Sequence, residues 1–260
     1  MCTPHSGSWP GGETREGELT TITSGDGTSL PLFIARPDGP APWPTVLIMH
    51  DYFDPEHFYH QLARRYAGEG FLAVVPSLFH RQGPLSEQND AAASARIAAV
   101  TDAAVFDDVR ATLRHLEDGG MLSSAGVTGF CWGGRMTYLL GARFPELKVL
   151  MPFYGHLAAW SAPDGPKPHN PLAEADRITA PVVGSYGGAD PTIPLADVAA
   201  MEARLRDRGV PCELKIYEGC PHGFFRDGAH PAESGDAWER CLTALRRYVA
   251  APLPVSQRGA

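Results

Sequence analysis

Six residues in the middle of the chain, 129–134, read Gly-Phe-Cys-Trp-Gly-Gly and place a thiol between closely spaced glycines. The apolar run before them predicts a strand and the residues after them predict a helix, so Cys131 lies in a sharp strand-to-helix turn. Glycines let neighbouring backbone approach such a turn, and a helix N-terminus stabilises a thiolate. Most free cysteines are small buried hydrophobic residues, but this context predicts that Cys131 is a nucleophile.

A thiol nucleophile needs a base, and the base needs a carboxylate that orients it. Both follow Cys131 along the chain: Asp190 comes just after the apolar run 180–187, and His222 comes just after the run 213–219. Because the carboxyl ends of parallel strands meet at one edge of a sheet, we expect these three side chains to converge. The alternatives are a turn residue for the aspartate and a loop histidine for His222, since each is next to a proline.

Acyl transfer also needs two hydrogen-bond donors for the oxyanion. They are commonly the backbone N–H of the residue after the nucleophile and a second N–H from the loop after an early strand. Trp132 and Tyr52 are the predicted donors, because Tyr52 follows the apolar run 45–49. The alternative for the Tyr52 side chain is a plain pocket wall.

The chain contains ten histidines and five cysteines, so a metal site has to be considered. His57 and His60 are closely spaced but lack further ligands at convincing spacing, and the cysteines form no Cys-x-x-Cys pair. We therefore expect no metal. The histidines that could instead line a pocket are His50, His57, His60, His80, His156 and His169.

The elements that position these residues form an α/β pattern, because apolar runs alternate with amphipathic segments from residue 45 onward. This pattern predicts a mostly parallel central sheet with helices on both faces. Two further runs, 18–23 and 30–36, are separated by a turn sequence and predict antiparallel edge strands at the N-terminal end. The other predicted strands are 45–49, 71–76, 126–130, 148–153, 180–187 and 213–219, and the predicted helical regions are 55–69, 88–117, 132–143, 194–208 and 235–249.

The chain of 260 residues is expected to fold as one domain, 18–250, between a flexible N-terminal segment, 1–17, and a C-terminal tail, 251–260. The segment 155–177 is irregular and carries four prolines. It is predicted to be either a surface loop or a lid over the site, and we slightly favour the lid.

The side-chain charges, 22 basic against 30 acidic, give a net charge of −8. This field repels nucleic acid and anionic membranes, so neither is an expected partner, and an anionic substrate would need local arginines. An odd number of scattered cysteines and the absence of a signal or membrane-spanning segment in the sequence favour a cytoplasmic protein. We expect a small-molecule partner and a monomer or homodimer.

From about residue 18 to 249, the sequence resembles the dienelactone hydrolase family of α/β-hydrolases. The most specific matches are GFCWGG around Cys131, GGAD ending at Asp190, and HGFFR beginning at His222. The resemblance implies an α/β-hydrolase fold, a Cys131–Asp190–His222 triad, hydrolysis of a lactone or enol ester that carries a carboxylate, and no cofactor.

The resemblance also implies substrate-binding residues. The family's two arginines that hold a substrate carboxylate match Arg81 in LFHRQGP and Arg226 in HGFFR. Guanidinium groups suit a carboxylate, and the alternative is two solvated surface arginines. Asp51 stands where family members typically carry a glutamate that contacts the resting thiol. Its side chain is one methylene shorter, so thiol activation and substrate choice are expected to differ.

Together these features predict a hydrolase that cleaves a small ester or lactone through a Cys-His-Asp triad and an acyl-cysteine intermediate. The alternative is a non-hydrolytic protein of the same fold that binds, isomerises or rearranges a pathway intermediate. The altered surroundings of Asp51 and His156 motivate that alternative.

Overall fold

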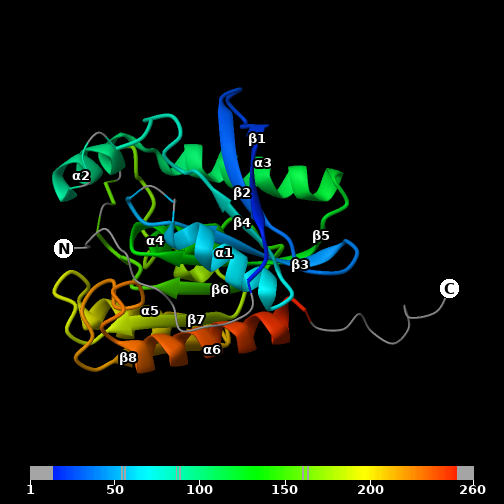
Figure 1. The fold of residues 1–260 in the computed structure, drawn as a ribbon. Helices are drawn as coiled ribbons and strands as arrows, with labels where there is room; N and C mark the ends of the chain where they lie inside the picture. Colours follow the sequence, from blue (N-terminus) through cyan, green and yellow to red (C-terminus); the bar gives the residue numbers. More distant parts are fainter. Residues whose placement is uncertain are drawn as a thin grey trace.

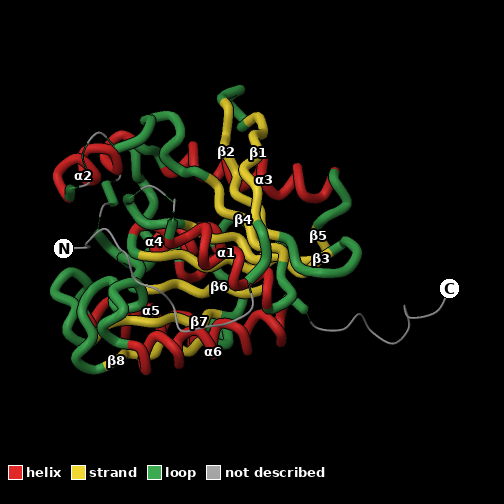
Figure 2. Tube along the Cα trace, viewed as in Figure 1, coloured by secondary structure: helices red, strands yellow, loops and turns green. Residues whose placement is uncertain are grey.

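A single eight-stranded sheet forms the centre of the computed structural model (Figures 1 and 2). The structure describes residues 14–53, 55, 57–85, 87, 89–159, 161–162 and 164–250. The strand order across the sheet is β1-β2-β4-β3-β5-β6-β7-β8. The strands are β1 (Gly17–Thr23), β2 (Ser29–Ala35), β3 (Trp43–Met49), β4 (Leu72–Pro76), β5 (Leu122–Phe130), β6 (Leu147–Phe153), β7 (Val182–Gly187) and β8 (Cys212–Tyr217).

The pairing of the strands confirms the predicted α/β fold. β1 pairs with β2, and β2 with β4, in antiparallel fashion, whereas every pair from β4 to β8 is parallel. The central strands are almost wholly apolar because both faces of the sheet are covered; Val46, Leu47 and Ile48 of β3, for example, are fully buried. The predicted antiparallel N-terminal edge is therefore correct as well.

Helices cover both faces of the sheet (Figure 1). On one face α1 and α6 pack together, and the rings of Tyr66 and Trp238 lie 4.6 Å apart. On the other face a buried ion pair between Asp102 and Arg135 joins α3 to α4. The helices are α1 (Phe58–Gly68), α2 (Asp90–Ala99), α3 (Asp102–Asp118), α4 (Trp132–Gly141), α5 (Leu195–Asp207), α6 (Pro231–Tyr248) and the short 3-10 helix η1 (Ala175–Arg177).

The single helical region predicted over 88–117 is corrected to two helices, α2 and α3. Val100 and Thr101 between them have extended backbone, and the Thr101 side chain accepts a hydrogen bond from the N–H of Ala104. A threonine in this position caps a new helix, so the chain changes direction there. The periodic apolar pattern runs across this break, which is why the sequence did not reveal it.

Two predicted terminal segments fall largely outside the described residues: all of the tail 251–260, and positions 1–13 of the segment 1–17. β1 begins at Gly17. Within the described ranges, no helix combines the length and apolar character that a bilayer crossing requires.

Arg81 links the turn between β1 and β2 to α3. Its guanidinium donates to both carboxylate oxygens of Asp108 on α3, each at 2.8 Å, and its Nε donates to Asp26 in the turn at 2.6 Å. The Asp108 carboxylate is fully buried and also receives hydrogen bonds from Ser24 and His80. Burial raises the pKa of Asp108, but the hydrogen bonds from His80, Arg81 and Ser24 outweigh it and hold the pKa below its ordinary value.

Replacing Arg81 with methionine is expected to lower the free energy of unfolding by about 3 kcal/mol at neutral pH, because it leaves a buried carboxylate without its cation. The folded-state pKa of Asp108 is depressed. The ion pair between Arg81 and Asp108 therefore contributes fully to stability above the unfolded-state pKa of about 3.9, and this stability is lost as the pH falls through the folded-state pKa. Urea unfolding of both proteins from pH 7 to pH 3 tests this. Arg110→Met is a matched control with an exposed ion pair to Asp107, and we expect a change of about 0.5 kcal/mol. Equal effects of the two substitutions would contradict the assignment.

Candidate active site

Cys131 occupies a strained turn between β5 and α4, with φ 56° and ψ −114°. Non-glycine residues rarely adopt a positive φ, and residues with a strained backbone cluster at functional sites. The flanking glycines make the turn possible: a Cβ on Gly129 would lie 2.2 Å from the carbonyl oxygen of Gly133, and one on Gly133 would lie 2.2 Å from that of Met49. The predicted strand-to-helix turn is therefore present, and the thiol lies at the N-terminus of α4.

Asp190 and His222 lie at the carboxyl ends of β7 and β8, as the sequence predicted. The Nδ1 atom of His222 is 2.6 Å from one carboxylate oxygen of Asp190. The other oxygen accepts from the backbone N–H and the hydroxyl of Thr192, at 2.8 and 2.7 Å. Burial raises the pKa of Asp190, but the hydrogen bonds from His222 and Thr192 outweigh it and keep the pKa below its ordinary value. An ionised Asp190 fixes the Nδ1–H tautomer of His222 and leaves Nε2 as the basic nitrogen.

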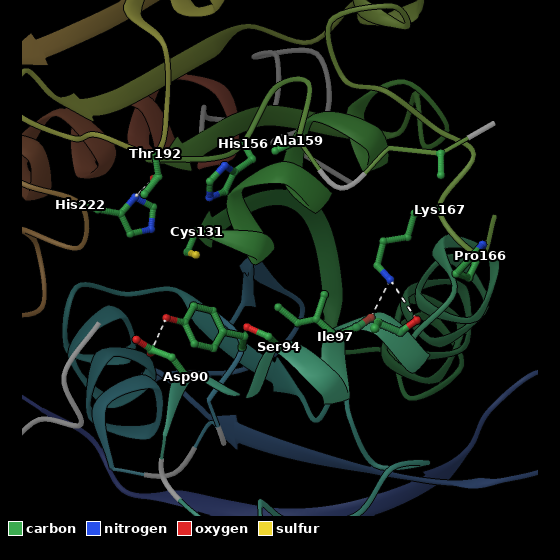
Figure 3. A pocket seen from close by; sticks show the side chains of 13 residues that line it. Asp90, Ser94, Ile97, Cys131, His156, Ala159, Pro166, Lys167, Thr192 and His222 are labelled. Atoms are coloured by element: carbon green, nitrogen blue, oxygen red, sulfur yellow. Dashed lines mark hydrogen bonds between the residues drawn. The ribbon is translucent and has the colours of Figure 1, made fainter. Parts of the chain in front are cut away.

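The structure brings Cys131 and His222 together with a third residue, His156 (Figure 3). The sulfur and one ring nitrogen from each histidine all lie within 4.8 Å of one another. Burial of His156 is the main reason that its pKa falls to about 4. The nearby His222 lowers the pKa further. The ring of His156 is therefore neutral at pH 7. It lies beside Cys131 and His222 without adding a positive charge there.

His156 is the residue whose importance the sequence only partly revealed. It was one of six histidines that could line a pocket, and it is the one of the six that lines the pocket at Cys131. Its position just after the end of β6 was the available signal. The others have different surroundings within the described residues; His50, for instance, accepts from the N–H of Leu78, and His60 stacks on Phe33.

A pocket of about 670 Å³ opens in front of Cys131. One wall comes from α2 and the opposite wall from the segment 155–177, so the irregular segment is part of the site (Figure 3). The lining residues are Tyr52, Asp90, Ser94, Ile97, Ala98, Cys131, His156, Ala159, Ala162, Pro166, Lys167, Thr192 and His222.

The middle of the segment 155–177 is anchored to the buried ion pair of Asp102 and Arg135. Arg135 donates to Asp102 at 2.6 and 3.0 Å and to the carbonyl of His169 at 2.6 Å. The backbone N–H of Asp102 in turn donates to the carbonyl of Pro166 at 3.1 Å. These bonds fix residues 166–169 against α3 and α4. Closure of the segment as a lid stays a prediction, and any such movement would have to leave this anchor intact.

Trp132 follows Cys131 in the chain, and Tyr52 lines the same pocket as Cys131. Trp132 is the first residue of α4, so its N–H has no acceptor within the helix. Tyr52 lines the pocket; its hydroxyl donates to Asp90 at 3.0 Å and its carbonyl accepts from Arg96 at 2.8 Å. Their role as oxyanion donors stays a prediction.

Asp51 and Arg226 form a buried ion pair with each other. The second carboxylate oxygen of Asp51 accepts from the N–H of Phe53 at 3.0 Å, and the guanidinium of Arg226 lies over the rings of Phe58 and Tyr59. Neither Asp51 nor Arg226 is among the described residues that line the pocket.

Arg81, the other predicted carboxylate-binding arginine, is also outside the pocket lining. Its guanidinium would have to leave Asp108 and Asp26 to reach a substrate. Substrate binding by Arg81, Arg226 and Asp51 therefore stays a prediction of the resemblance. The geometry of the described residues gives all three side chains partners within the protein.

Two groups of described residues have ligand atoms close enough to hold a metal ion, and neither includes His57 or His60. The first is Cys131, His156 and His222, where an ion would bind the thiol and a nitrogen of each ring. The second is Cys220, His230 and Glu233, near the start of α6.

Comparison with known proteins agrees with this fold. The family model described as "Dienelactone hydrolase family" matches residues 30–249. A Salmonella typhimurium protein named "Putative carboxymethylenebutenolidase" is 34% identical over 243 residues, which is 88% of this chain and 87% of the relative. A Bradyrhizobium protein named "Probable 2-oxo-3-(5-oxofuran-2-ylidene)propanoate lactonase" is 31% identical and covers 86% of this chain and 92% of its own length.

A solved structure points to the same family. The crystal structure titled "Putative Dienelactone Hydrolase" from Klebsiella pneumoniae superposes with a TM-score of 0.83 and 31% identity, over 90% of this chain and 99% of the other. With a family model that matches most of the chain, and relatives and a solved structure that agree over nearly its whole length, the chain belongs to the dienelactone hydrolase family.

Proposed function

We propose that the protein hydrolyses a small ester or lactone through an acyl-cysteine intermediate on Cys131, with His222 as the base and Asp190 as the residue that orients it. The observation that carries the proposal is the 2.6 Å contact between Nδ1 of His222 and a carboxylate oxygen of Asp190. A nitrogen of the same His222 ring lies within 4.8 Å of the Cys131 sulfur. The position of the thiol at the N-terminus of α4 adds support, because that position favours the thiolate.

In the acylation step, Nε2 of His222 takes the thiol proton and the sulfur forms a bond to the carbonyl carbon of the substrate. The negative charge that develops on the carbonyl oxygen is stabilised by the backbone N–H groups of Trp132 and Tyr52. When the carbon–oxygen bond breaks, the imidazolium of His222 returns the proton to the leaving oxygen. Asp190 stabilises the imidazolium while it exists.

In the deacylation step, neutral His222 removes a proton from a water molecule as the water attacks the acyl carbon. The bond between carbon and sulfur then breaks, the acid is released, and the proton returns to the Cys131 sulfur. Neutral His156, next to both residues, lets His222 become positively charged without a charged neighbour at that position.

The substrate class follows from the pocket and the relatives. A volume of about 670 Å³ suits a small molecule, and two relatives are named for the hydrolysis of butenolide or furanylidene lactones. We infer a small lactone or ester.

The free thiols of Cys131, Cys212, Cys220 and Cys241 support the expectation of a reducing, cytoplasmic environment.

Replacing Cys131 with alanine is expected to lower kcat for an activated ester such as 4-nitrophenyl acetate by about 1,000-fold or more, because the sole nucleophile is lost. Brief incubation of the unaltered protein with ester and acid quenching should give a mass increase of one acyl group on the peptide that contains residue 131. Cys212→Ala, which removes a thiol on β8 outside the pocket lining, is the control and should keep both activity and adduct. Undiminished turnover in the Cys131 variant would contradict the proposal, and a binding or isomerising protein would give no adduct.

Replacing Asp190 with asparagine is expected to lower kcat by about 100-fold or more, because the amide no longer fixes the Nδ1–H tautomer or stabilises the imidazolium. Since the pKa of Asp190 lies below its ordinary value, the carboxylate stays ionised above pH 5, and its titration should not appear in the kcat profile of the unaltered protein from pH 5 to 8. Thr192→Val removes one hydrogen bond to the same carboxylate and should cost only about 10-fold. An Asp190 variant with losses no larger than those of Thr192→Val would argue against the assigned role.

A further inference from the structure

We propose that Lys167 forms an anion subsite at the far end of the pocket from Cys131 and recognises a carboxylate on the ester or lactone. This inference rests on the function proposed above and adds the residue that recognises the carboxylate that the resemblance implies. Neither the sequence pattern nor the predicted arginine pair pointed to this lysine.

The position of Lys167 carries the argument. It belongs to the segment 155–177, and its side chain reaches across to the last turn of α2, where its Nζ donates to the carbonyl of Ile97 at 2.6 Å and, more weakly, to that of Ala98 at 3.5 Å. Ile97, Ala98 and Lys167 all line the pocket, on the other side of it from Cys131 and His222 (Figure 3). Lys167 is only 5% exposed, so it is a buried cation in the wall of the site rather than a surface lysine.

The hydrogen-bonding capacity of the ammonium points to a ligand. An ammonium group has three donors, and the two helix carbonyls account for two of them. The carbonyl end of α2 carries partial negative charge, which favours the charged lysine there. Burial lowers the pKa of Lys167, with Asp102 opposing and Arg135 reinforcing that effect. A substrate carboxylate would supply the third acceptor and compensate the cost of burying the charge.

The distribution of charge around the pocket makes Lys167 the natural partner of an anion. Among the described residues that line the pocket, Lys167 is the only lysine or arginine. The acidic residue in the same lining, Asp90, accepts a hydrogen bond from the hydroxyl of Tyr52. Arg81 and Arg226 are paired with carboxylates of the protein itself. Since the chain as a whole carries a charge of −8, attraction of an anionic substrate has to come from a local group of this kind.

The backbone around Lys167 is held in place. Its carbonyl accepts from the N–H of Ala162 at 2.8 Å, and the carbonyl of the preceding Pro166 accepts from Asp102, a member of the buried ion pair with Arg135. A cation fixed in this way binds an anion without a large loss of side-chain freedom. The anchor of the segment 155–177 thus positions the proposed subsite.

The test uses two esters that differ in one group, 4-acetoxybenzoate and 4-acetoxybenzamide. The unaltered protein is expected to prefer the acid in kcat/KM. In Lys167→Met the ratio of the two kcat/KM values should fall about 30-fold, mainly through KM for the acid, whereas Lys167→Arg should keep most of the preference. Binding of 4-hydroxybenzoate and 4-hydroxybenzamide to Cys131→Ala, with and without Lys167→Met, measures the same preference without turnover.

The controls separate this inference from the proposed function. Acylation of Cys131 by 4-acetoxybenzamide, followed by mass spectrometry, reports on the function alone and is expected in the unaltered protein and in a folded Lys167→Met variant. No preference for the acid in the unaltered protein, or equal losses for both esters in Lys167→Met, would overturn the subsite and leave Lys167 as a structural link to α2. Loss of the preference in Arg81→Met but not in Lys167→Met would overturn it in favour of the arginine.

Discussion

The sharp backbone turn at Cys131 constrains everything around it. A positive φ at this position, together with glycines at 129 and 133, lets α4 start directly against the ends of β3 and β5. The same contact holds the thiol in a fixed position at the carboxyl edge of the sheet. Because β7 and β8 run parallel to β5, their ends bring Asp190 and His222 to that edge, so the register of the sheet sets the spacing of the site.

Buried ion pairs hold the parts of the chain that surround the sheet, including one wall of the pocket. Asp102 and Arg135 are both buried and together hold the segment 155–177, which forms one wall. Arg81 joins the N-terminal hairpin to α3, and Arg226 pairs with Asp51 beside the site. A buried carboxylate requires a cation, so each of these arginines has a structural role in addition to any other. Among the described residues that line the pocket there is one lysine and no arginine, so we expect Lys167 to influence substrate choice.

Asp51 and His156 differ in their partners within the protein. The carboxylate of Asp51 lies against Arg226 and accepts from the N–H of Phe53. His156 lies near both Cys131 and His222 as a neutral ring.

Sequence alone determined the α/β order of the elements, the antiparallel edge, the turn at Cys131 and the strand ends that carry Asp190 and His222, because each depends on local periodicity, glycine spacing and chain order. It missed the break between α2 and α3, since one capping threonine interrupts an otherwise continuous periodic pattern. It also could not show that Arg81 faces Asp108 or that Lys167 faces the pocket. Those partners are distant in sequence, and only the packing of the folded chain decides which charged groups meet and which ones face the site.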